Sequence, residues 1–262
     1  MTQILIAVCI LGAIGLLGGT LLSVVSTLCD KGESNERLAE IRDALPGANC
    51  GACGFAGCDS YAEAVDNGTA EPNLCAPGGT DAAKKLSEIL GVEIEAVEKV
   101  AKVSCNGCND NTDTKYNYVG LKSCAAAAAI SAGPMSCEFG CIGFGDCVSA
   151  CSFNAISVKS GVAVVDESIC GGCGSCAKVC PKQIINIVQK KKAAFVPCSN
   201  KQKGAAAKKA CKVACIGCGI CAKKCEAGAI KVENFLATID PEKCTGCGNC
   251  VSACPQKIIV LA

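Results

Sequence analysis

Histidine and tryptophan are absent from this chain of 262 residues, and aromatic residues make up only 3% of it. Without histidine the chain can supply neither Rieske-type ligation nor a Cys–His zinc finger, and it has no imidazole for acid–base catalysis. A core so poor in large side chains would be marginally stable without inorganic cross-links. The net charge of +1 says little about partners.

Cysteine is abundant instead, with 27 residues, a share that indicates a special scaffold. Disulfides are the simplest explanation, but the odd number, the many C-x-x-C units and the chain length argue against them. Zinc sites usually join two cysteine pairs across a longer spacer and do not need a third and fourth cysteine so close. A zinc-binding module without redox function stays open as an alternative.

The segment 169–181 reads ICGGCGSCAKVCP, in which three cysteines stand two residues apart and a fourth follows after three more. In ferredoxins, three such cysteines hold one [4Fe–4S] cluster and the fourth binds the neighbouring cluster. The pattern returns in 244–255, in altered form in 215–225 and in stretched form in 137–151. This repetition predicts two tandem ferredoxin-like domains with two clusters each.

If the fourth cysteine of each loop binds the cluster of the partner loop, the pattern predicts four sets of iron ligands. The sets are Cys137, Cys141, Cys147 and Cys180; Cys151, Cys170, Cys173 and Cys176; Cys215, Cys218, Cys221 and Cys254; and Cys225, Cys244, Cys247 and Cys250. Apolar runs after two of the motifs, broken by turn residues, predict β-hairpins within 156–165 and 230–239.

Nearer the N-terminus, four cysteines follow a C-x2-C-x4-C-x16-C pattern. They are Cys50, Cys53, Cys58 and Cys75. The first two alone could form a redox dithiol, but the other two favour a fifth cluster. Five more cysteines lack a standard spacing. We expect Cys105, Cys124, Cys198 and Cys211 to hold a sixth cluster, with Cys108 left over.

The stretch 4–28 contains no charged residue and is long enough to cross a bilayer as one helix. A cleaved signal peptide is disfavoured because no basic residue precedes the apolar run. Basic residues follow the run, which indicates a single-pass anchor in the cell membrane with the bulk of the chain in the cytoplasm.

Lysines are concentrated in the segment from Lys190 to Lys212, and no Asp or Glu occurs between residues 168 and 225. The simpler interpretation is a solubilising linker. The functional one is a positive surface that attracts an acidic partner. The sequence contains no phosphate loop, dinucleotide fingerprint or nucleophile–base pair, so we expect neither NAD nor flavin on this chain, no complete active site and no nucleic acid partner.

Several blocks occur in a fixed order: an apolar N-terminal stretch, LPGANCGACGFAGCDSYAEAV with NLCAPGG, KYNYVGLKSCAAA, CEFGCIGFGDCVSAC and the ferredoxin repeats. Over nearly its whole length the chain thereby resembles the B component of the Rnf complex. The resemblance implies an iron–sulfur subunit that takes electrons from reduced ferredoxin and relays them to membrane and flavin-bearing subunits of a Na+- or H+-transporting ferredoxin:NAD+ oxidoreductase. A polyferredoxin of another membrane oxidoreductase, such as a hydrogenase, is the alternative.

The expected architecture is α+β, with about six [4Fe–4S] clusters on a membrane-anchored chain. The expected segments are a transmembrane anchor (1–29), a four-cysteine α domain (30–90), a connecting region with further ligands (91–133), a first ferredoxin-like domain (134–197), a basic linker with ligands (198–213) and a second ferredoxin-like domain (214–262).

Overall fold

The computed structural model describes residues 15–16, 18–24, 35–96 and 98–261. Most of the expected transmembrane span, 4–28, therefore lies outside the described residues. Residues 15–16 and 18–24 are helical and expose Leu16, Leu21 and Leu22. Within the described ranges, none of the helices combines the length and apolar character needed to cross a bilayer.

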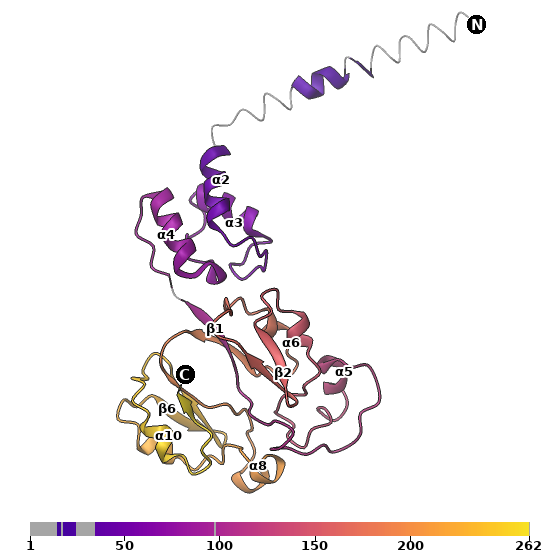
Figure 1. Ribbon diagram of the computed structural model, residues 1–262, viewed down its shortest axis with the longest axis vertical. Coiled ribbons are helices and arrows are strands. Elements are labelled where there is room, and N and C mark those ends of the chain that lie inside the picture. The colour runs from indigo at the N-terminus through magenta and orange to yellow at the C-terminus, as the bar shows by residue number, and fades with distance from the viewer. Residues whose placement is uncertain (1–14, 17, 25–34, 97, 262) are drawn as a thin grey trace, which may run out of the picture.

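The first folded group is helical, as the sequence predicts. It contains α2 (Asn35–Ala44), α3 (Cys58–Asp66), the short 3-10 helix η1 (Ala76–Gly78) and α4 (Gly79–Leu90). The three α-helices pack around Ile41, Tyr61 and Leu86, each at most 1% exposed. In Figure 1 this group lies above the two ferredoxin-like units, which are described next.

The first ferredoxin-like unit consists of two antiparallel strand pairs and two short helices. The elements are β1 (Lys99–Val103) with β4 (Ile185–Gln189), β2 (Ile156–Lys159) with β3 (Val162–Val165), α6 (Asp146–Ser149) and α7 (Ser175–Lys178). The β2–β3 hairpin confirms the prediction for 156–165. The register pairs Lys99 with Gln189, so β1 joins this unit although it precedes 134.

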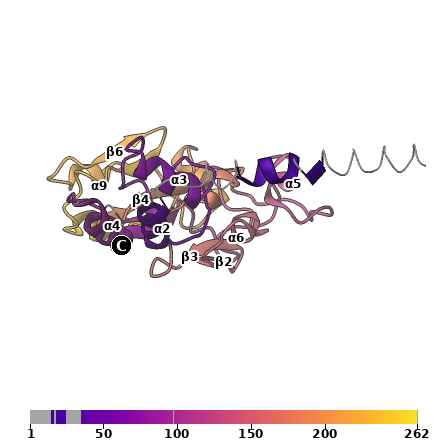
Figure 2. The same cartoon turned by 90° about the horizontal axis from the view of Figure 1, so that it is seen from above.

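The second unit repeats this arrangement. Its elements are β5 (Ala194–Phe195) with β8 (Val260–Leu261), β6 (Ile230–Glu233) with β7 (Leu236–Ile239), α9 (Ile220–Lys223) and α10 (Asn249–Ala253). The β6–β7 hairpin is again as predicted, whereas β5 precedes the expected start at 214. Figures 1 and 2 both show β6 and the β2–β3 hairpin on different sides of the molecule.

Two further helices lie in the segments beside the units, α5 (Cys124–Ala128) and α8 (Gly204–Ala210). Cysteines form a large part of the core in both units, where they pack with small and β-branched side chains. The largest fully buried side chains described are Tyr61, Ile41, Leu86, Val100 and the polar Asn200. The stability of the two cores therefore depends on the groups that the cysteine thiols bind.

Glycine in the second spacer position of a C-x-x-C loop allows a neighbouring backbone to approach the thiols. Gly172 has a φ of +63°, and a Cβ there would lie 2.5 Å from the carbonyl oxygen of Lys99 in β1. Gly217 occupies the same place in the second unit, with a φ of +65° and Phe235 backbone atoms 2.7 Å from its ideal Cβ. Any other residue would strain the loop and push away the neighbouring backbone, which is β1 at Gly172 and the β6–β7 turn at Gly217.

Candidate functional site

Neighbouring cysteines form six sites in the described part of the chain. Site 1 is Cys50, Cys53, Cys58 and Cys75; site 2 is Cys151, Cys170, Cys173 and Cys176; site 3 is Cys124, Cys141, Cys147 and Cys180; site 4 is Cys105, Cys137, Cys198 and Cys211; site 5 is Cys215, Cys218, Cys221 and Cys254; site 6 is Cys225, Cys244, Cys247 and Cys250. In sites 3, 4, 5 and 6 the four cysteines line a common cavity, and Cys141 of site 3 also borders the site 4 cavity.

The fourth cysteine of each loop lies with the opposite loop, as the crossed pattern predicts. Cys180 lines the site 3 cavity and Cys254 lines the site 5 cavity, although each follows a different loop in sequence. Cys225 lines the site 6 cavity in the same way. The structure thus brings these thiols together, and their ligation of iron stays a prediction.

The structure differs from the sequence-based grouping by one exchange. Cys124, which we expected in the sixth set, lies beside Cys141, Cys147 and Cys180. Cys137, which we expected beside Cys141, Cys147 and Cys180, lines a different cavity with Cys105, Cys198 and Cys211. The structure therefore places Cys124 with the site 3 thiols and Cys137 with the site 4 thiols, and which cysteines bind iron stays a prediction. The physical reason is a carboxylate that fixes the segment before α5.

The carboxylate of Asp146 fixes Cys124 in site 3. It accepts hydrogen bonds from the backbone N–H of Cys124 at 2.9 Å and of Ala125 at 3.1 Å, and from the Ser123 hydroxyl at 2.9 Å. Burial opposes ionisation of Asp146, but these hydrogen bonds outweigh it and lower its pKa. Because Asp146 directly precedes Cys147, it holds two cysteines of one site together.

Replacing Asp146 with Ala should therefore empty site 3 in a large fraction of molecules. Loss of the three hydrogen bonds frees the start of α5, and Cys124 loses its position beside Cys147. We expect iron content to fall by up to about four atoms per chain. Glu88→Ala, an exposed carboxylate on α4, is the matched control and should retain full iron. Equal iron in both variants would contradict this positioning role.

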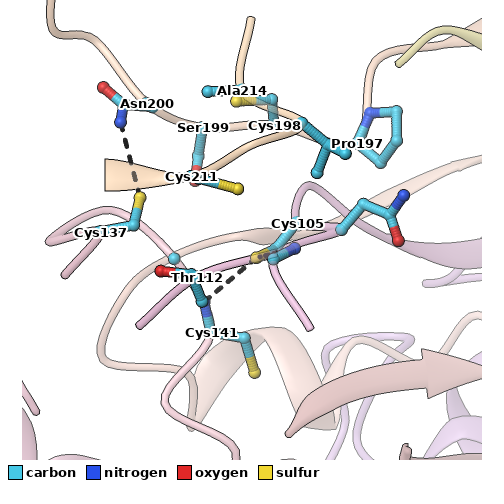
Figure 3. Close-up of a pocket in the computed structure, with 14 residues that line it drawn as sticks. Cys105, Thr112, Cys137, Cys141, Pro197, Cys198, Ser199, Asn200, Cys211 and Ala214 are labelled. Atoms are coloured by element: carbon cyan, nitrogen blue, oxygen red, sulfur yellow. Dashed lines mark hydrogen bonds between the residues drawn. The ribbon is translucent and has the colours of Figure 1, made fainter. Parts of the chain in front are cut away.

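Site 4 is assembled from four separate segments around one cavity. Figure 3 shows Cys198 and Cys211 on one side of the cavity, with Cys105 and Cys137 facing them. Hydrogen bonds hold the segments together: Thr112 Oγ1 donates to the Ala210 carbonyl at 2.8 Å, and Ser199 Oγ donates to the Phe139 carbonyl at 2.7 Å. The site therefore depends on contacts between the two ferredoxin-like units.

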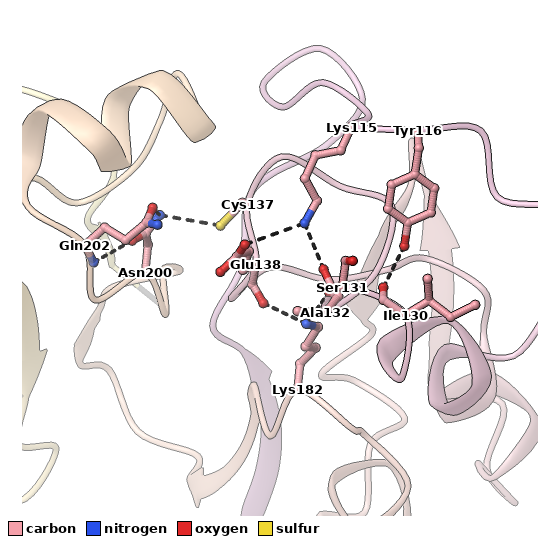
Figure 4. A network of polar contacts seen from close by, with 10 residues as sticks. All are labelled: Lys115, Tyr116, Ile130, Ser131, Ala132, Cys137, Glu138, Lys182, Asn200 and Gln202. Atoms are coloured by element: carbon pink, nitrogen blue, oxygen red, sulfur yellow. Dashed lines mark hydrogen bonds and ion pairs between the residues drawn. The ribbon is translucent and has the colours of Figure 1, made fainter.

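A buried amide supports one thiol of site 4. Asn200 is 1% exposed, and its Nδ2 donates to the Sγ of Cys137 at 3.6 Å, while its Oδ1 accepts from the Gln202 backbone N–H at 2.8 Å. Figure 4 shows this contact beside a network in which Lys182 Nζ donates to the carbonyl of Glu138 at 2.7 Å. No motif in the sequence marks Asn200 as a functional residue.

Backbone N–H groups donate to cysteine sulfurs at equivalent places in the two units. Ala101 in β1 donates to the Sγ of Cys170 at 3.5 Å, and Ala194 in β5 donates to the Sγ of Cys244 at 3.4 Å. Ala155 donates to Cys151 at 3.4 Å. Such bonds stabilise negative charge on sulfur, which suits ligands of an iron–sulfur cluster. The strands that open each unit thus contribute directly to sites 2 and 6.

Burial makes the free thiols hard to ionise. Burial, with a smaller contribution from nearby cysteines, raises the pKa of Cys105 to about 12 and that of Cys147 to about 12. Thiolate ligands in these sites therefore need the positive charge of bound metal. In the described ranges, no three Cys, Asp or Glu side chains converge closely enough to hold a single metal ion. The thiols stand around apolar cavities, and this donor set fits a cluster with several irons.

Site 1 is fixed by the buried phenol of Tyr61. Its hydroxyl donates to the Glu71 carbonyl at 2.8 Å and accepts from the Leu74 backbone N–H at 3.1 Å. These bonds hold the loop that carries Cys75 against α3. Burial, with smaller contributions from the nearby Cys58, Cys53 and Cys50, raises the pKa of the Cys75 thiol to about 11.

Comparison with known families supports the iron–sulfur interpretation. Residues 140–196 and 214–258 match a 4Fe-4S dicluster domain family, and 169–230 match a second family of the same description. Residues 45–77, which include all of site 1, match an Fe-S cluster family. These matches lie in both ferredoxin-like units and in the N-terminal helical group.

Three relatives are similar over almost the whole chain. The B component of the Na(+)-translocating ferredoxin:NAD(+) oxidoreductase complex of Acetobacterium woodii is 40% identical over 99% of this chain and 78% of its own length. The B component of the ion-translocating oxidoreductase complex of Methanosarcina acetivorans is 41% identical over 100% of both chains. The proton-translocating counterpart of Clostridium ljungdahlii is 39% identical over 93% of this chain and 87% of its own. The chain belongs to the family of B components of ion-translocating ferredoxin:NAD+ oxidoreductase (Rnf) complexes.

Proposed function

We propose that this chain is the iron–sulfur electron-transfer subunit of an ion-translocating ferredoxin:NAD+ oxidoreductase. It receives electrons from reduced ferredoxin and passes them to other subunits of the complex. The relatives' names and the 4Fe-4S family matches support this function. The observation that carries it is the set of six four-cysteine sites within one chain. When bound, a [4Fe–4S] cluster supplies one-electron chemistry at each site.

The residues of the chain position and tune this chemistry. Cysteine thiolates hold the iron, backbone N–H groups stabilise charge on sulfur, and apolar walls exclude water from the cavities. Burial is uneven: most of the cysteines are buried or half-buried, whereas Cys218 in site 5 and Cys247 in site 6 are exposed. The second ferredoxin-like unit is therefore the accessible end for an external electron donor.

The run Lys190–Lys192 lies against the site 6 loop. A Cβ on Gly246 would lie 2.7 Å from the Lys192 carbonyl oxygen, and Gly246 directly precedes the exposed Cys247. All three lysines are exposed. Lys190 forms an ion pair with Glu98 at 3.5 Å, while the structure shows no ion pair for Lys191 or Lys192 within its described ranges. This positive surface would guide an acidic ferredoxin to site 6.

Charge reversal at the two unpaired lysines tests this docking surface. Lys191→Glu with Lys192→Glu should slow reduction by ferredoxin about tenfold at low salt, and the rate should depend less on ionic strength. Lys84→Glu with Lys85→Glu, exposed on α4, is the matched control. Stopped-flow absorbance measures both rates. An unchanged rate in the Lys191/Lys192 variant would leave this segment as a linker.

The N-terminal apolar stretch anchors the chain in the cell membrane as a single pass, with the bulk of the chain in the cytoplasm, and other Rnf subunits carry flavin, NAD and the ion path. The exposed Leu16, Leu21 and Leu22 support a lipid or subunit contact. The first ferredoxin-like unit starts at β1 and the second at β5, because these strands complete the respective sheets.

Anaerobic co-purification and rapid mixing test this function against the alternatives. The intact chain should be recovered from membranes with flavin-bearing partners, and reduced ferredoxin should bleach its cluster absorbance. Recovery with a hydrogenase would favour a polyferredoxin of that complex. Zinc without iron, sulfide or a reducible signal would favour the zinc-binding module.

A further inference from the structure

We infer that site 4 is a cluster site that joins the two ferredoxin-like units, so that all six sites form one unbranched series in numerical order. None of the family matches assigns it: they describe two dicluster domains and an N-terminal site, and Cys105 and Cys137 lie outside all the matched ranges. The inference deepens the proposed electron-transfer function and rests on it.

Site 4 contacts a cysteine of each neighbouring site through a single hydrogen bond. The backbone N–H of Cys141, a site 3 cysteine, donates to the Sγ of Cys105 at 3.3 Å. The backbone N–H of Cys215, a site 5 cysteine, donates to the Sγ of Cys198 at 3.4 Å. In Figure 3 the thiol of Cys141 points away from the site 4 cavity, so Cys141 faces site 3 and serves site 4 only through its backbone.

The same contacts explain why the site needs both units. Cys105 follows β1 of the first unit, and Cys198 follows β5 of the second. Cys211 is held by the cross-link between Thr112 and the Ala210 carbonyl, and by the bond from the Lys212 backbone N–H to the Asn111 carbonyl at 2.8 Å. Four thiols from both units thus converge where the units meet, and a site there connects site 3 to site 5.

The other end of the series is also defined by contact. Pro77, two residues after Cys75, packs on the site 2 loop: a Cβ on Gly171 would lie 3.0 Å from the Cα of Pro77. Site 1 therefore adjoins site 2. Site 2 adjoins site 3, and site 5 adjoins site 6, because the fourth cysteine of each loop lies in the neighbouring site. Each transfer moves one electron between neighbouring sites, with no bond formed or broken.

Cys108 is the matched control within the site's own loop. It lies three residues from Cys105 and near Cys211, but it does not line the cavity, and Asn111 Nδ2 donates to its Sγ at 3.1 Å. Cys211→Ala should lose about four irons per chain, whereas Cys108→Ala should keep the wild-type content. The reverse result, or no iron loss in Cys211→Ala, would overturn the assignment of site 4.

Electron uptake by Cys211→Ala tests the series itself. Dithionite is a small reductant that reaches every site, and it should deliver about five electrons per chain, while reduced ferredoxin should deliver about two, to sites 5 and 6. Ferredoxin uptake as full as dithionite uptake would exclude an unbranched series. Failure of ferredoxin to reduce the wild type would instead refute the proposed function and leave the iron result standing.

A milder variant covers the case in which Cys211→Ala does not fold. Asn200→Leu removes a hydrogen-bond donor from the Cys137 sulfur without touching a cysteine. Because that donor favours the more negative, reduced state, one cluster signal should shift to lower potential in an EPR-monitored titration, with iron content unchanged. Potentials identical to those of the wild type would contradict a cluster at Cys137.

Discussion

Stripping iron from the anaerobically purified chain is expected to unfold both ferredoxin-like units. Cysteines form a large part of their cores. Few large apolar side chains are fully buried there, so little packing remains when the clusters are removed. In a domain this small, metal binding and folding are coupled, so removal of the metal removes much of the folding free energy. Circular dichroism after acid or chelator treatment should show loss of strand signal and of a cooperative thermal transition.

Reconstitution provides the control for this expectation. Iron and sulfide added back under anaerobic conditions should restore both the circular dichroism and the cluster absorbance together, since the sites form only in the folded chain. The N-terminal helical group has its own apolar core around Ile41, Tyr61 and Leu86 and should retain part of its helix signal. A metal-free chain that keeps its strand signal and melts cooperatively would contradict the coupling.

Replacing Cys180 with Ala is expected to remove the cluster of site 3 and to spare that of site 2. Cys180 belongs by sequence to the loop of Cys170 and Cys176, yet it lines the cavity of Cys141 and Cys147. The loss should be about four irons per chain. A difference EPR spectrum identifies which site is lost: the Cys180→Ala spectrum should match that of Cys147→Ala.

The comparison variant for this experiment is Cys176→Ala, which empties site 2. If the Cys180→Ala difference spectrum matched Cys176→Ala instead, ligation would be confined to each loop and the crossed arrangement would be wrong. The second unit offers an independent repeat, because Cys254 lies in the cavity of site 5 rather than that of its own loop. Cys254→Ala should accordingly resemble Cys221→Ala.

Local spacing allowed most of the two units to be predicted from the sequence. A cysteine run such as 169–181 leaves little freedom for the loop, and the apolar runs after 155 and 229 can pair only across the short turns at 160–161 and 234–235. The crossed partners then follow from the helix that carries each fourth cysteine away from its loop. Both hairpins agree with the structure for this reason. In three of the four repeat sets the expected cysteines lie together, and their ligation of iron stays a prediction.

Long-range contacts could not be read from spacing. Cys124 and Cys137 exchange places because Asp146 binds a segment 22 residues away in sequence, and no motif marks that contact. The strands β1 and β5 are short, and only their pairing with β4 and β8 shows that they open the two units. Asn200 was missed because a buried amide has no sequence signature until its sulfur partner is placed.

The most direct test of the account is a count of iron, acid-labile sulfide and zinc per chain in protein prepared without oxygen. Six four-cysteine sites predict about 24 irons, an equal amount of sulfide and no stoichiometric zinc. A count of about 20 irons would leave only five sites and contradict a cluster in every four-cysteine site. Zinc in place of iron and sulfide would contradict the account as a whole.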